Sequence, residues 1–267
     1  MTAPEVEIRV LGPVGVDGAA HPFRRPWALE LVVYLAFHRD GVTSDTWAAA
    51  LWPDRLLADP TRHSTASAAR RALGRSADGQ DHLPRAHGVL RLCPTVATDW
   101  DRFERLAREP DPASWSAALS LVRGRPFDGL RSPDWTVLEG VAARVEDGVV
   151  QTALRLAGHH LEAGEGHAAE LALRRALLAS PYDERLYRRL LEAADRQGNP
   201  GGVESAMAEL VRLVRGDVPV RGPVGREGTR SGRAEADPTV WVHPETAAVY
   251  RSLTRRRCPA VTSAGRG

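Results

Sequence analysis

The sequence predicts a mainly α-helical protein with a small β component, in which a winged helix-turn-helix precedes an α-helical repeat domain of the tetratricopeptide (TPR) type. Three observations lead to this prediction. Residues 5–23 are short apolar runs broken by turn residues, a pattern typical of small strands joined by tight turns. Three segments with helical spacing of apolar residues follow before residue 75. From Ala113 onward the helical pattern continues almost to the end of the chain.

Three helices are expected after the first strands, over residues 26–39, 46–51 and 60–73. The first and the third begin with proline, whose fixed φ suits the first turn of a helix. Asp59 is the expected N-cap of the third helix, since a short carboxylate there accepts a bond from a free backbone N–H. Gly74 follows at a position where helices commonly end in a left-handed residue.

A hairpin is expected after the third helix. Residues 82–85 and 89–92 are expected to pair as its two strands, with Ala86-His87-Gly88 as the turn between them. Strands, three helices and a terminal hairpin are the elements of a winged helix-turn-helix, in which the hairpin is the wing.

The third helix has two chemically distinct sides on a helical wheel. The inner side is apolar and carries Ala66, Ala69 and Leu73. The opposite side is polar and basic, and it carries Ser64, Ser67, Arg71 and Arg75, with Arg70 at the edge. Such a helix fits the major groove of DNA, where arginine reads guanine edges and serine contacts several base edges or phosphates.

Positive charge is concentrated around this helix. The whole chain has a net charge of only +2, and all of its 36 basic residues are arginine. Between Pro60 and Leu92, however, six arginines face two acidic residues, an excess of +4. A local basic patch of this kind favours a nucleic-acid partner, which the net charge of the chain alone does not indicate.

The second half of the chain predicts stacked helix pairs. Gly164 and Gly198 lie 34 residues apart, which is the TPR period. Small or apolar residues recur at the same offset: Ala169 with Val203, Ala172 with Ala206, and Leu177 with Val211. About two repeats align in this way.

These patterns set the expected domain boundaries. The winged helix-turn-helix is expected over residues 5–98 and the TPR-like domain over residues 99–257. Within the latter, residues 216–240 are rich in glycine and proline, which predicts a flexible insert before a last helix over 243–256. Residues 258–267 are expected to form a disordered tail.

Nothing in the sequence suggests an exported or membrane-bound chain. The first residues lack a basic segment followed by an apolar core. The longest uncharged apolar run, Leu31 to Phe37, is too short to cross a bilayer. Cys93 and Cys258 have neither disulfide-framework nor metal-ligand spacing. We therefore expect a cytoplasmic protein that has no membrane partner.

Short motifs along the chain resemble those of one family of regulators. In order, they are Val10-Leu11-Gly12-Pro13-Val14, Val16-Asp17-Gly18, Arg25-Pro26-Trp27-Ala28-Leu29, Tyr34-Leu35-Ala36, Leu51-Trp52-Pro53, Arg70-Arg71-Ala72-Leu73-Gly74, Thr98-Asp99-Trp100-Asp101-Arg102-Phe103, Gly124-Arg125-Pro126-Phe127, Asp134-Trp135, Pro181-Tyr182-Asp183-Glu184 with Leu186-Tyr187, Gly198-Asn199 and Pro244-Glu245-Thr246. In order and spacing they are similar to the Streptomyces antibiotic regulatory protein (SARP) family, in which an OmpR-like winged helix precedes a bacterial transcriptional activator domain (BTAD). The resemblance covers residues 6–256.

The resemblance implies a DNA-binding transcriptional activator whose TPR-like domain supports dimer formation and contacts RNA polymerase. The recognition helix departs from the family pattern in two respects. Ala66 and Ala69 stand where larger aliphatic residues are usual, and Ala68 stands where a basic residue is common. These departures predict a helix that lies closer to the body of the domain and contacts fewer phosphates.

The predicted DNA-binding residues are Ser64, Ser67, Arg70, Arg71, Arg75, Arg85 and Arg91. The last two belong to the hairpin and are expected to reach the minor groove or nearby phosphates. One helix in one groove binds weakly, so we expect a homodimer on double-stranded DNA with two half-sites. The alternative is a protein-interaction adaptor whose degenerate winged helix no longer binds DNA, and the three alanines favour it.

No catalytic residue, metal site or cofactor is expected. Three histidines lie near one turn, at His159, His160 and His167. Their spacing with Glu162 does not make the two-histidine motif of zinc hydrolases, so a helix-end role is favoured. The glycines over residues 222–232 lack both the preceding strand and the lysine of a phosphate-binding loop. Neither cysteine has a base and an orienting partner nearby in the sequence.

Overall fold

The computed structural model describes residues 5–84, 88–216 and 237–256. This part of the chain is mainly helical with a small β component, which confirms the predicted fold class. The chain divides into two compact units, residues 1–149 and residues 150–267, and each has its own apolar core.

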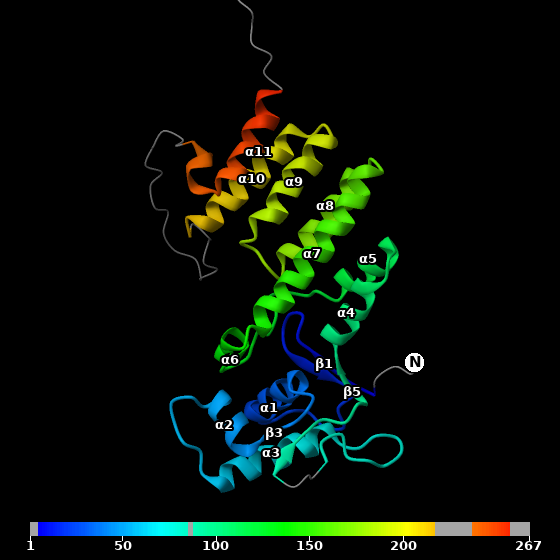
Figure 1. Ribbon diagram of the computed structural model, residues 1–267, viewed down its shortest axis with the longest axis vertical. Coiled ribbons are helices and arrows are strands. Elements are labelled where there is room, and N and C mark those ends of the chain that lie inside the picture. The colour runs from blue at the N-terminus through cyan, green and yellow to red at the C-terminus, as the bar shows by residue number, and fades with distance from the viewer. Residues whose placement is uncertain (1–4, 85–87, 217–236, 257–267) are drawn as a thin grey trace, which may run out of the picture. The chain divides into compact units, whose positions relative to one another are not determined.

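The first unit begins with a small three-stranded sheet. Its central strand is β1 (Val6–Arg9), which pairs antiparallel with β2 (Gly15–Asp17) and parallel with β5 (Val96–Thr98) (Figure 1). Val6 and Ile8 are fully buried, whereas the residues between and after them are half-buried. The alternation arises because successive side chains of a strand point to opposite faces, so one face of the sheet covers the core.

Three helices follow the first hairpin: α1 (Pro26–Phe37), α2 (Ser44–Leu51) and α3 (Asp59–Leu73). α1 is the central helix, with eight of its residues buried. α3 packs against α1, and Ala66 and Ala69 lie on its buried side. Small side chains at a helix contact allow two backbones to approach each other, as expected for this helix from its sequence.

The helices α2 and α3 differ in their N-caps. The hydroxyl of Thr43 accepts a hydrogen bond from the N–H of Thr46 at 3.2 Å and caps α2. The expected cap of α3 is wrong, because Asp59 is already the first helical residue and Ala58 precedes it without a side-chain bond. Asp59 instead pairs with Arg62 one turn later, at 2.7 Å.

The wing pairs with a different segment from the one expected. β4 (Val89–Leu90) forms an antiparallel pair with β3 (Val42–Thr43), the short strand before α2. Residues 82–84 were expected to pair with this segment but form no strand. Residues 85–87, which include Ala86 and His87 of the predicted turn, lie outside the described residues.

Residues 82–84 serve another purpose. Leu83 is fully buried, and its carbonyl accepts a hydrogen bond from Nε of Arg70 at 2.8 Å. Pro84 has no N–H to give to a strand ladder. The segment is therefore fixed to α3, and a backbone bond from the N–H of Cys93 to the carbonyl of His82 joins it to the chain beyond β4.

Three further helices belong to the first unit: α4 (Asp99–Arg108), α5 (Pro112–Ser120) and α6 (Asp134–Leu138), followed by the start of α7 (Val141–Glu162). The buried carboxylate of Asp99 fastens α4 to the end of β1. It accepts bonds from the N–H of Val10 at 2.8 Å and of Leu11 at 3.3 Å. Nη2 of Arg123 donates to the same carboxylate at 2.5 Å.

A second buried carboxylate fastens α1 to the chain before α6. Glu30 of α1 accepts bonds from the N–H of Arg131 at 2.9 Å and of Ser132 at 3.1 Å. Beside it, Trp135 of α6 packs against Tyr34 of α1, with ring centroids 5.0 Å apart. The winged helix-turn-helix and the first helices that follow it thus share one core.

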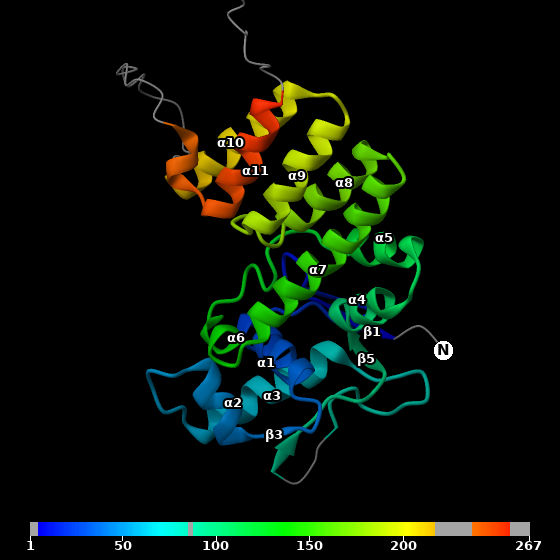
Figure 2. The same cartoon turned by 45° about the horizontal axis from the view of Figure 1, so that its top comes forward.

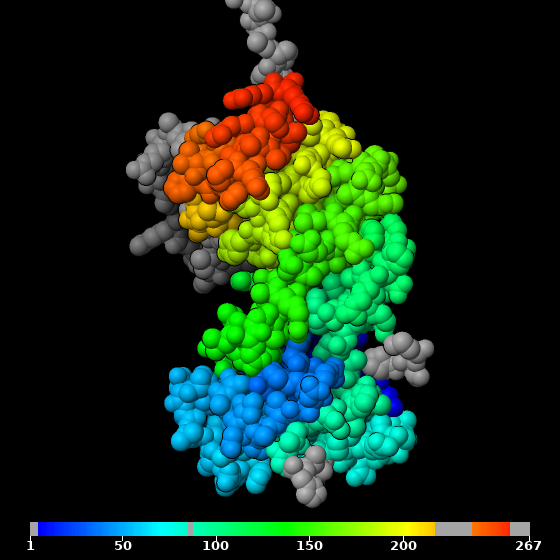
Figure 3. All heavy atoms as spheres, in the orientation of Figure 1, coloured from blue at the N-terminus to red at the C-terminus, as the bar shows by residue number. Residues whose placement is uncertain are grey.

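The chain between α2 and α3 lies at the surface of the first unit, light blue in Figure 3. Leu56 in this segment is fully exposed, whereas Trp52 just before it is buried and packs against Trp27 with ring centroids 4.2 Å apart.

The second unit is entirely helical in its described residues. After the rest of α7 it contains α8 (Gly166–Leu177), α9 (Glu184–Arg196), α10 (Pro200–Val214), the 3₁₀ helix η1 (Pro238–Trp241) and α11 (Pro244–Arg255). α8, α9, α10 and α11 lie side by side in both ribbon views (Figure 2). α9 is at the centre, because α8, α10 and α11 all pack against it.

The repeat predicted at an offset of 34 residues corresponds to two helix hairpins. Gly164 ends α7 with φ +80° and Gly198 ends α9 with φ +63°, so both turns use a left-handed residue. All six matched residues from Ala169 to Val211 are buried. The predicted last helix is α11, with His243 as its N-cap. Residues 217–236, within the expected insert, and the expected tail lie outside the described residues.

Among the described helices, none combines the length and the apolar content needed to cross a membrane.

Candidate nucleic-acid interface

The outer side of α3 is the candidate interface. Beyond the first turn, its exposed residues are His63, Ser64, Ser67 and Arg71. Its buried residues are Thr65, Ala66, Ala69, Ala72 and Leu73. The structure thus brings three of the predicted residues, the two serines and Arg71, together on the solvent side of this helix.

Arg71 and Arg75 differ in their surroundings. Arg71 is exposed, and it forms no ion pair with a described carboxylate. Nε of Arg75 lies 2.9 Å from Oδ1 of Asp81, in the turn after α3. In the same turn the hydroxyl of Ser76 donates to Asp78 and lowers the pKa of that carboxyl group. Arg71 is therefore free to meet an anion, whereas Arg75 shares its charge with a neighbouring carboxylate.

The remaining predicted residues have other positions. Arg70 is half-buried and donates to the carbonyl of Leu83, so it holds the chain that leads to the wing. Arg91 follows β4 and is exposed. Arg85 lies outside the described residues.

The two ends of α3 differ in charge. At its start the guanidinium of Arg62 pairs with both Asp45 and Asp59. The side chains of both carboxylates are largely exposed. Because one arginine faces two carboxylates, this group of three residues carries one net negative charge. The basic character of the helix belongs to its second half, around Arg71.

The chain before α1 supplies basic residues that the sequence analysis did not assign to the interface. His21, Arg24 and Arg25 are exposed and run beside α3. Nη1 of Arg25 donates to Oγ of Ser64 at 2.8 Å. The cluster of basic residues before Pro26 is the sequence signal that points to them.

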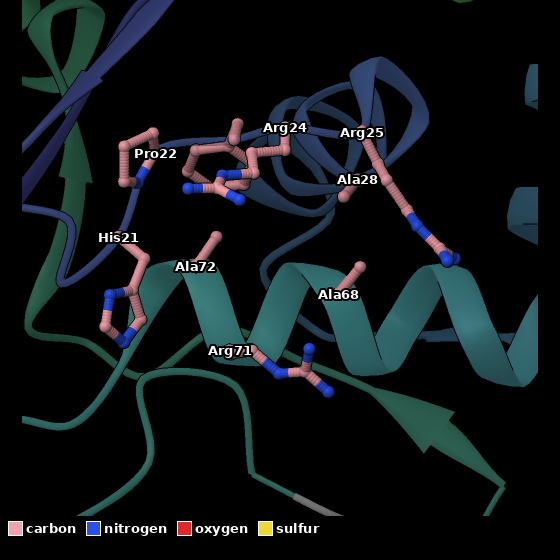
Figure 4. A pocket seen from close by; sticks show the side chains of 9 residues that line it. His21, Pro22, Arg24, Arg25, Ala28, Ala68, Arg71 and Ala72 are labelled. Atoms are coloured by element: carbon pink, nitrogen blue, oxygen red, sulfur yellow. The ribbon is translucent and has the colours of Figure 1, made fainter.

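These residues surround a cavity of about 350 Å³. Its lining comprises His21, Pro22, Phe23, Arg24, Arg25, Ala28, Ala68, Arg71 and Ala72. Figure 4 shows Arg24 and Arg25 on the chain that enters α1, and Arg71, Ala68 and Ala72 on α3 across from them. The described lining therefore contains three arginines and one histidine, and no carboxylate.

The described residues contain no group of three or more His, Cys, Asp or Glu side chains placed to hold a metal ion. Of the three histidines near Gly164, His160 stands at the end of α7, and its Nδ1 lies 2.7 Å from Oε2 of Glu165. That contact closes the turn between α7 and α8.

Comparison with known proteins agrees with this architecture. Residues 98–217 match the family described as the bacterial transcriptional activator domain. No curated protein sequence matches the chain. A solved structure of Mycobacterium tuberculosis EmbR in complex with a low affinity phosphopeptide is similar in fold, with a TM-score of 0.60 and 24% sequence identity. The match covers 94% of this chain and 65% of the EmbR chain, so this chain spans less than two thirds of that structure's length.

At this identity the likeness to EmbR concerns the fold, and the activator-domain match concerns the sequence itself. Both agree with the order of motifs along the chain. The chain carries a bacterial transcriptional activator domain behind a winged helix-turn-helix, and its resemblance to SARP-like transcriptional regulators is confirmed.

Proposed function

We propose that this regulator binds double-stranded DNA through the outer side of α3 and activates transcription. The single observation that carries the proposal is the exposed row of Ser64, Ser67 and Arg71 on α3. Arginine and serine side chains on one exposed helix side match the donors and acceptors of base edges in the major groove. Two exposed serines stand beside the guanidinium of Arg71, which no described carboxylate pairs with, so this side of the helix can meet an anionic partner.

The roles proposed for the basic residues follow from their contacts. Arg71, without a described carboxylate partner, is the residue proposed to read a base edge. Arg75 is proposed to contribute less, because DNA must compete with Asp81 for its guanidinium. Arg70 is proposed to act mainly by holding the segment around Leu83. Two arginines of the predicted wing, Arg85 and Arg91, are proposed to contact the DNA backbone.

The functional division is proposed at residues 98 and 99, with DNA binding assigned to residues 5–98 and partner binding to residues 99–257. The residues proposed to touch DNA all precede residue 98. The proposed partners of the activator domain are a second copy of the chain and RNA polymerase. A helical repeat stack offers a curved surface to such partners. Since transcription takes place at the bacterial chromosome, the proposed location is the cytoplasm.

Binding to DNA is tested by fluorescence anisotropy of the full chain with a labelled random-sequence duplex at several salt concentrations. A DNA-binding protein loses affinity steeply with salt, since it releases counterions from the phosphates that it contacts. We expect a linear log–log dependence with a slope of several units. The double variant Ser67→Ala/Arg71→Ala is expected to bind more weakly, whereas Arg105→Ala, which removes an exposed arginine of α4, is expected to bind as the wild type does.

The adaptor remains the second candidate, and one feature of the structure favours it. Asp45 of α2 and Asp59 of α3 lie beside the start of α3, where they repel phosphates and are only partly neutralised by Arg62. A winged helix that docks on protein would tolerate such charges. Absence of binding to any duplex at low salt would establish the adaptor and overturn the proposal.

A further inference from the structure

We propose that residues 21–25, on the flank of α3 beside Arg71, form a cradle that binds a phosphodiester of the DNA backbone, next to the groove that α3 enters. This inference rests on the proposed function and adds a second element to the interface. The cradle is the cavity of about 350 Å³ lined by His21, Arg24, Arg25 and Arg71.

The chain before α1 is held against α3 at both ends of this cradle. The N–H of Ala20 donates to the carbonyl of Leu73 at 3.4 Å, and the N–H of His21 donates to that of Ala72 at 3.0 Å. At the other end Arg25 donates to Ser64. Eight residues of helix between Ser64 and Ala72 span about 12 Å. The segment is thus fixed along more than two turns of α3. Binding of a phosphate therefore requires little further ordering of the chain.

The charge of the cradle is positive and uncompensated. Its described lining holds no Asp or Glu, and no described carboxylate pairs with Arg24, Arg25 or Arg71. Arg25 gives one N–H to Ser64, which leaves further donors of its guanidinium for an anion. All the ionised side chains of the described lining are positive, so an anion bound there meets no carboxylate that would repel it.

The floor of the cradle explains why the cavity is open. Ala28, Ala68 and Ala72 line it where α1 and α3 face each other, and their small side chains leave the space between the arginines empty. The arginines of the lining therefore supply positive charge and hydrogen-bond donors, while the small alanine side chains leave space for an anion. Arginine binds phosphate oxygens through two parallel N–H bonds, which suits walls of this kind.

The phosphate is proposed to belong to DNA because the cradle adjoins the exposed side of α3. Arg71 lines the cavity and also lies on the helix side proposed to enter the groove. A helix in the major groove has sugar-phosphate backbone on both flanks, so a basic segment along one flank meets one strand. Such a contact fixes the register of the protein on the duplex and does not read the sequence.

The test compares Arg24→Ala with the control Arg105→Ala, which removes the same charge from α4 of the same unit. Anisotropy titrations of the full chain are made from about 50 to 200 mM NaCl, with a random duplex and with a duplex selected for tight binding. If Arg24 neutralises one phosphate, its loss lowers the magnitude of the log–log slope by about 0.9 on both duplexes. The control is expected to keep the wild-type slope. Circular dichroism and the melting temperature establish that both variants are folded.

A second arm distinguishes the DNA backbone from free phosphate as the source of the anion. The melting temperatures of wild type and Arg24→Ala are compared in inorganic phosphate and in NaCl of equal ionic strength. A lowered slope for Arg24→Ala supports the cradle on DNA, whatever phosphate alone does. An unchanged slope overturns it, and a phosphate-dependent melting temperature lost in Arg24→Ala would then assign the cavity to a free anion. Failure of the wild type to bind either duplex would instead overturn the proposed function itself.

Discussion

Nη1 of Arg25 donates a hydrogen bond to Oγ of Ser64, and the two atoms are 2.8 Å apart. The residues are 39 positions apart in the sequence, and the bond joins the chain before α1 to the outer side of α3. Ser64 is therefore a support for an arginine as well as a candidate for contact with DNA.

If Ser64 orients Arg25 toward the duplex, removing both side chains will cost less binding energy than the sum of the two single losses. For Ser64→Ala and Arg25→Ala we expect a coupling energy of about 0.5–1.5 kcal/mol in a double-mutant cycle of DNA binding. The same cycle with Ser67→Ala in place of Ser64→Ala is expected to be additive within about 0.5 kcal/mol. Equal coupling in both cycles would show that the bond has no part in binding.

Arg71 and Arg75 are both exposed arginines near the end of α3, but of the two only Arg75 pairs with a carboxylate in the described part of the chain. Arg71→Ala is expected to weaken binding to a selected duplex by about 1–3 kcal/mol and to relax specificity at one base position. Arg75→Ala is expected to cost less, because Asp81 already competes for its guanidinium. Gel-shift titrations with duplexes changed at single positions measure both effects. Unaltered affinity and specificity in Arg71→Ala would remove this residue from the interface.

The elements around α3 could be predicted because their signals are local. Pro26 and Gly74 mark a helix start and a helix end, and the spacing of Ala66, Ala69 and Leu73 defines a buried side. The exposed side of α3 follows from the same periodicity. The repeat hairpins are equally local, since Gly164 and Gly198 each end a helix in a left-handed turn.

The missed features all depend on the path of the chain in space. β4 pairs with β3, more than 40 residues earlier, and the wing therefore differs from a local hairpin. Arg24 lies beside α3 because Ala20 and His21 form backbone bonds with the end of that helix. Nothing in the local periodicity of either segment encodes such contacts, which are determined by tertiary packing.

The carboxylate of Glu30 gives a pH-dependent contribution to stability with a definite sign. Burial raises the pKa of Glu30 from its ordinary value of 4.5, and the bonds from Arg131 and Ser132 oppose this shift. Below pH 4.5 the group is mostly protonated in both states. As the pH rises, the unfolded chain ionises first, so the contribution of Glu30 to stability is lost through the interval above 4.5.

Glu30→Gln removes this titration and keeps the size of the side chain. The free energy of unfolding of the wild type, minus that of Glu30→Gln, is expected to fall between pH 4 and pH 7, by about 1.4 kcal/mol for each unit of pKa shift. Urea denaturation at half-unit steps of pH measures the difference. A difference that grows with pH would mean that the two backbone bonds outweigh burial.

Gly12 permits the close approach of two segments in the first unit. Its φ is +144°, and a Cβ there would lie 2.9 Å from Cβ of Arg123 and from the N atom of Gly124. Gly12→Ala is expected to cost about 1–3 kcal/mol for the overpacking in addition to backbone strain. Gly129→Ala is the matched control, since Gly129 has φ +92° but no neighbour within 4 Å of the added atom. Equal melting temperatures for the two variants would contradict the close approach.

Tyr187 fastens the centre of the second unit. Its hydroxyl donates to Oε1 of Glu209 at 3.3 Å, and Nη1 of Arg174 donates to the same carboxylate at 2.5 Å, so α8, α9 and α10 meet there. Burial raises the pKa of Tyr187, which keeps its hydroxyl protonated as a donor.

Tyr187→Phe is expected to cost about 0.5–1.5 kcal/mol of unfolding free energy, because Glu209 keeps Arg174 as a partner. Tyr182→Phe, at an exposed tyrosine, is expected to change stability by less than about 0.5 kcal/mol. Urea denaturation followed by far-ultraviolet circular dichroism measures both, and an unchanged stability in Tyr187→Phe would mean that the bond from the tyrosine hydroxyl to Glu209 does not stabilise the unit.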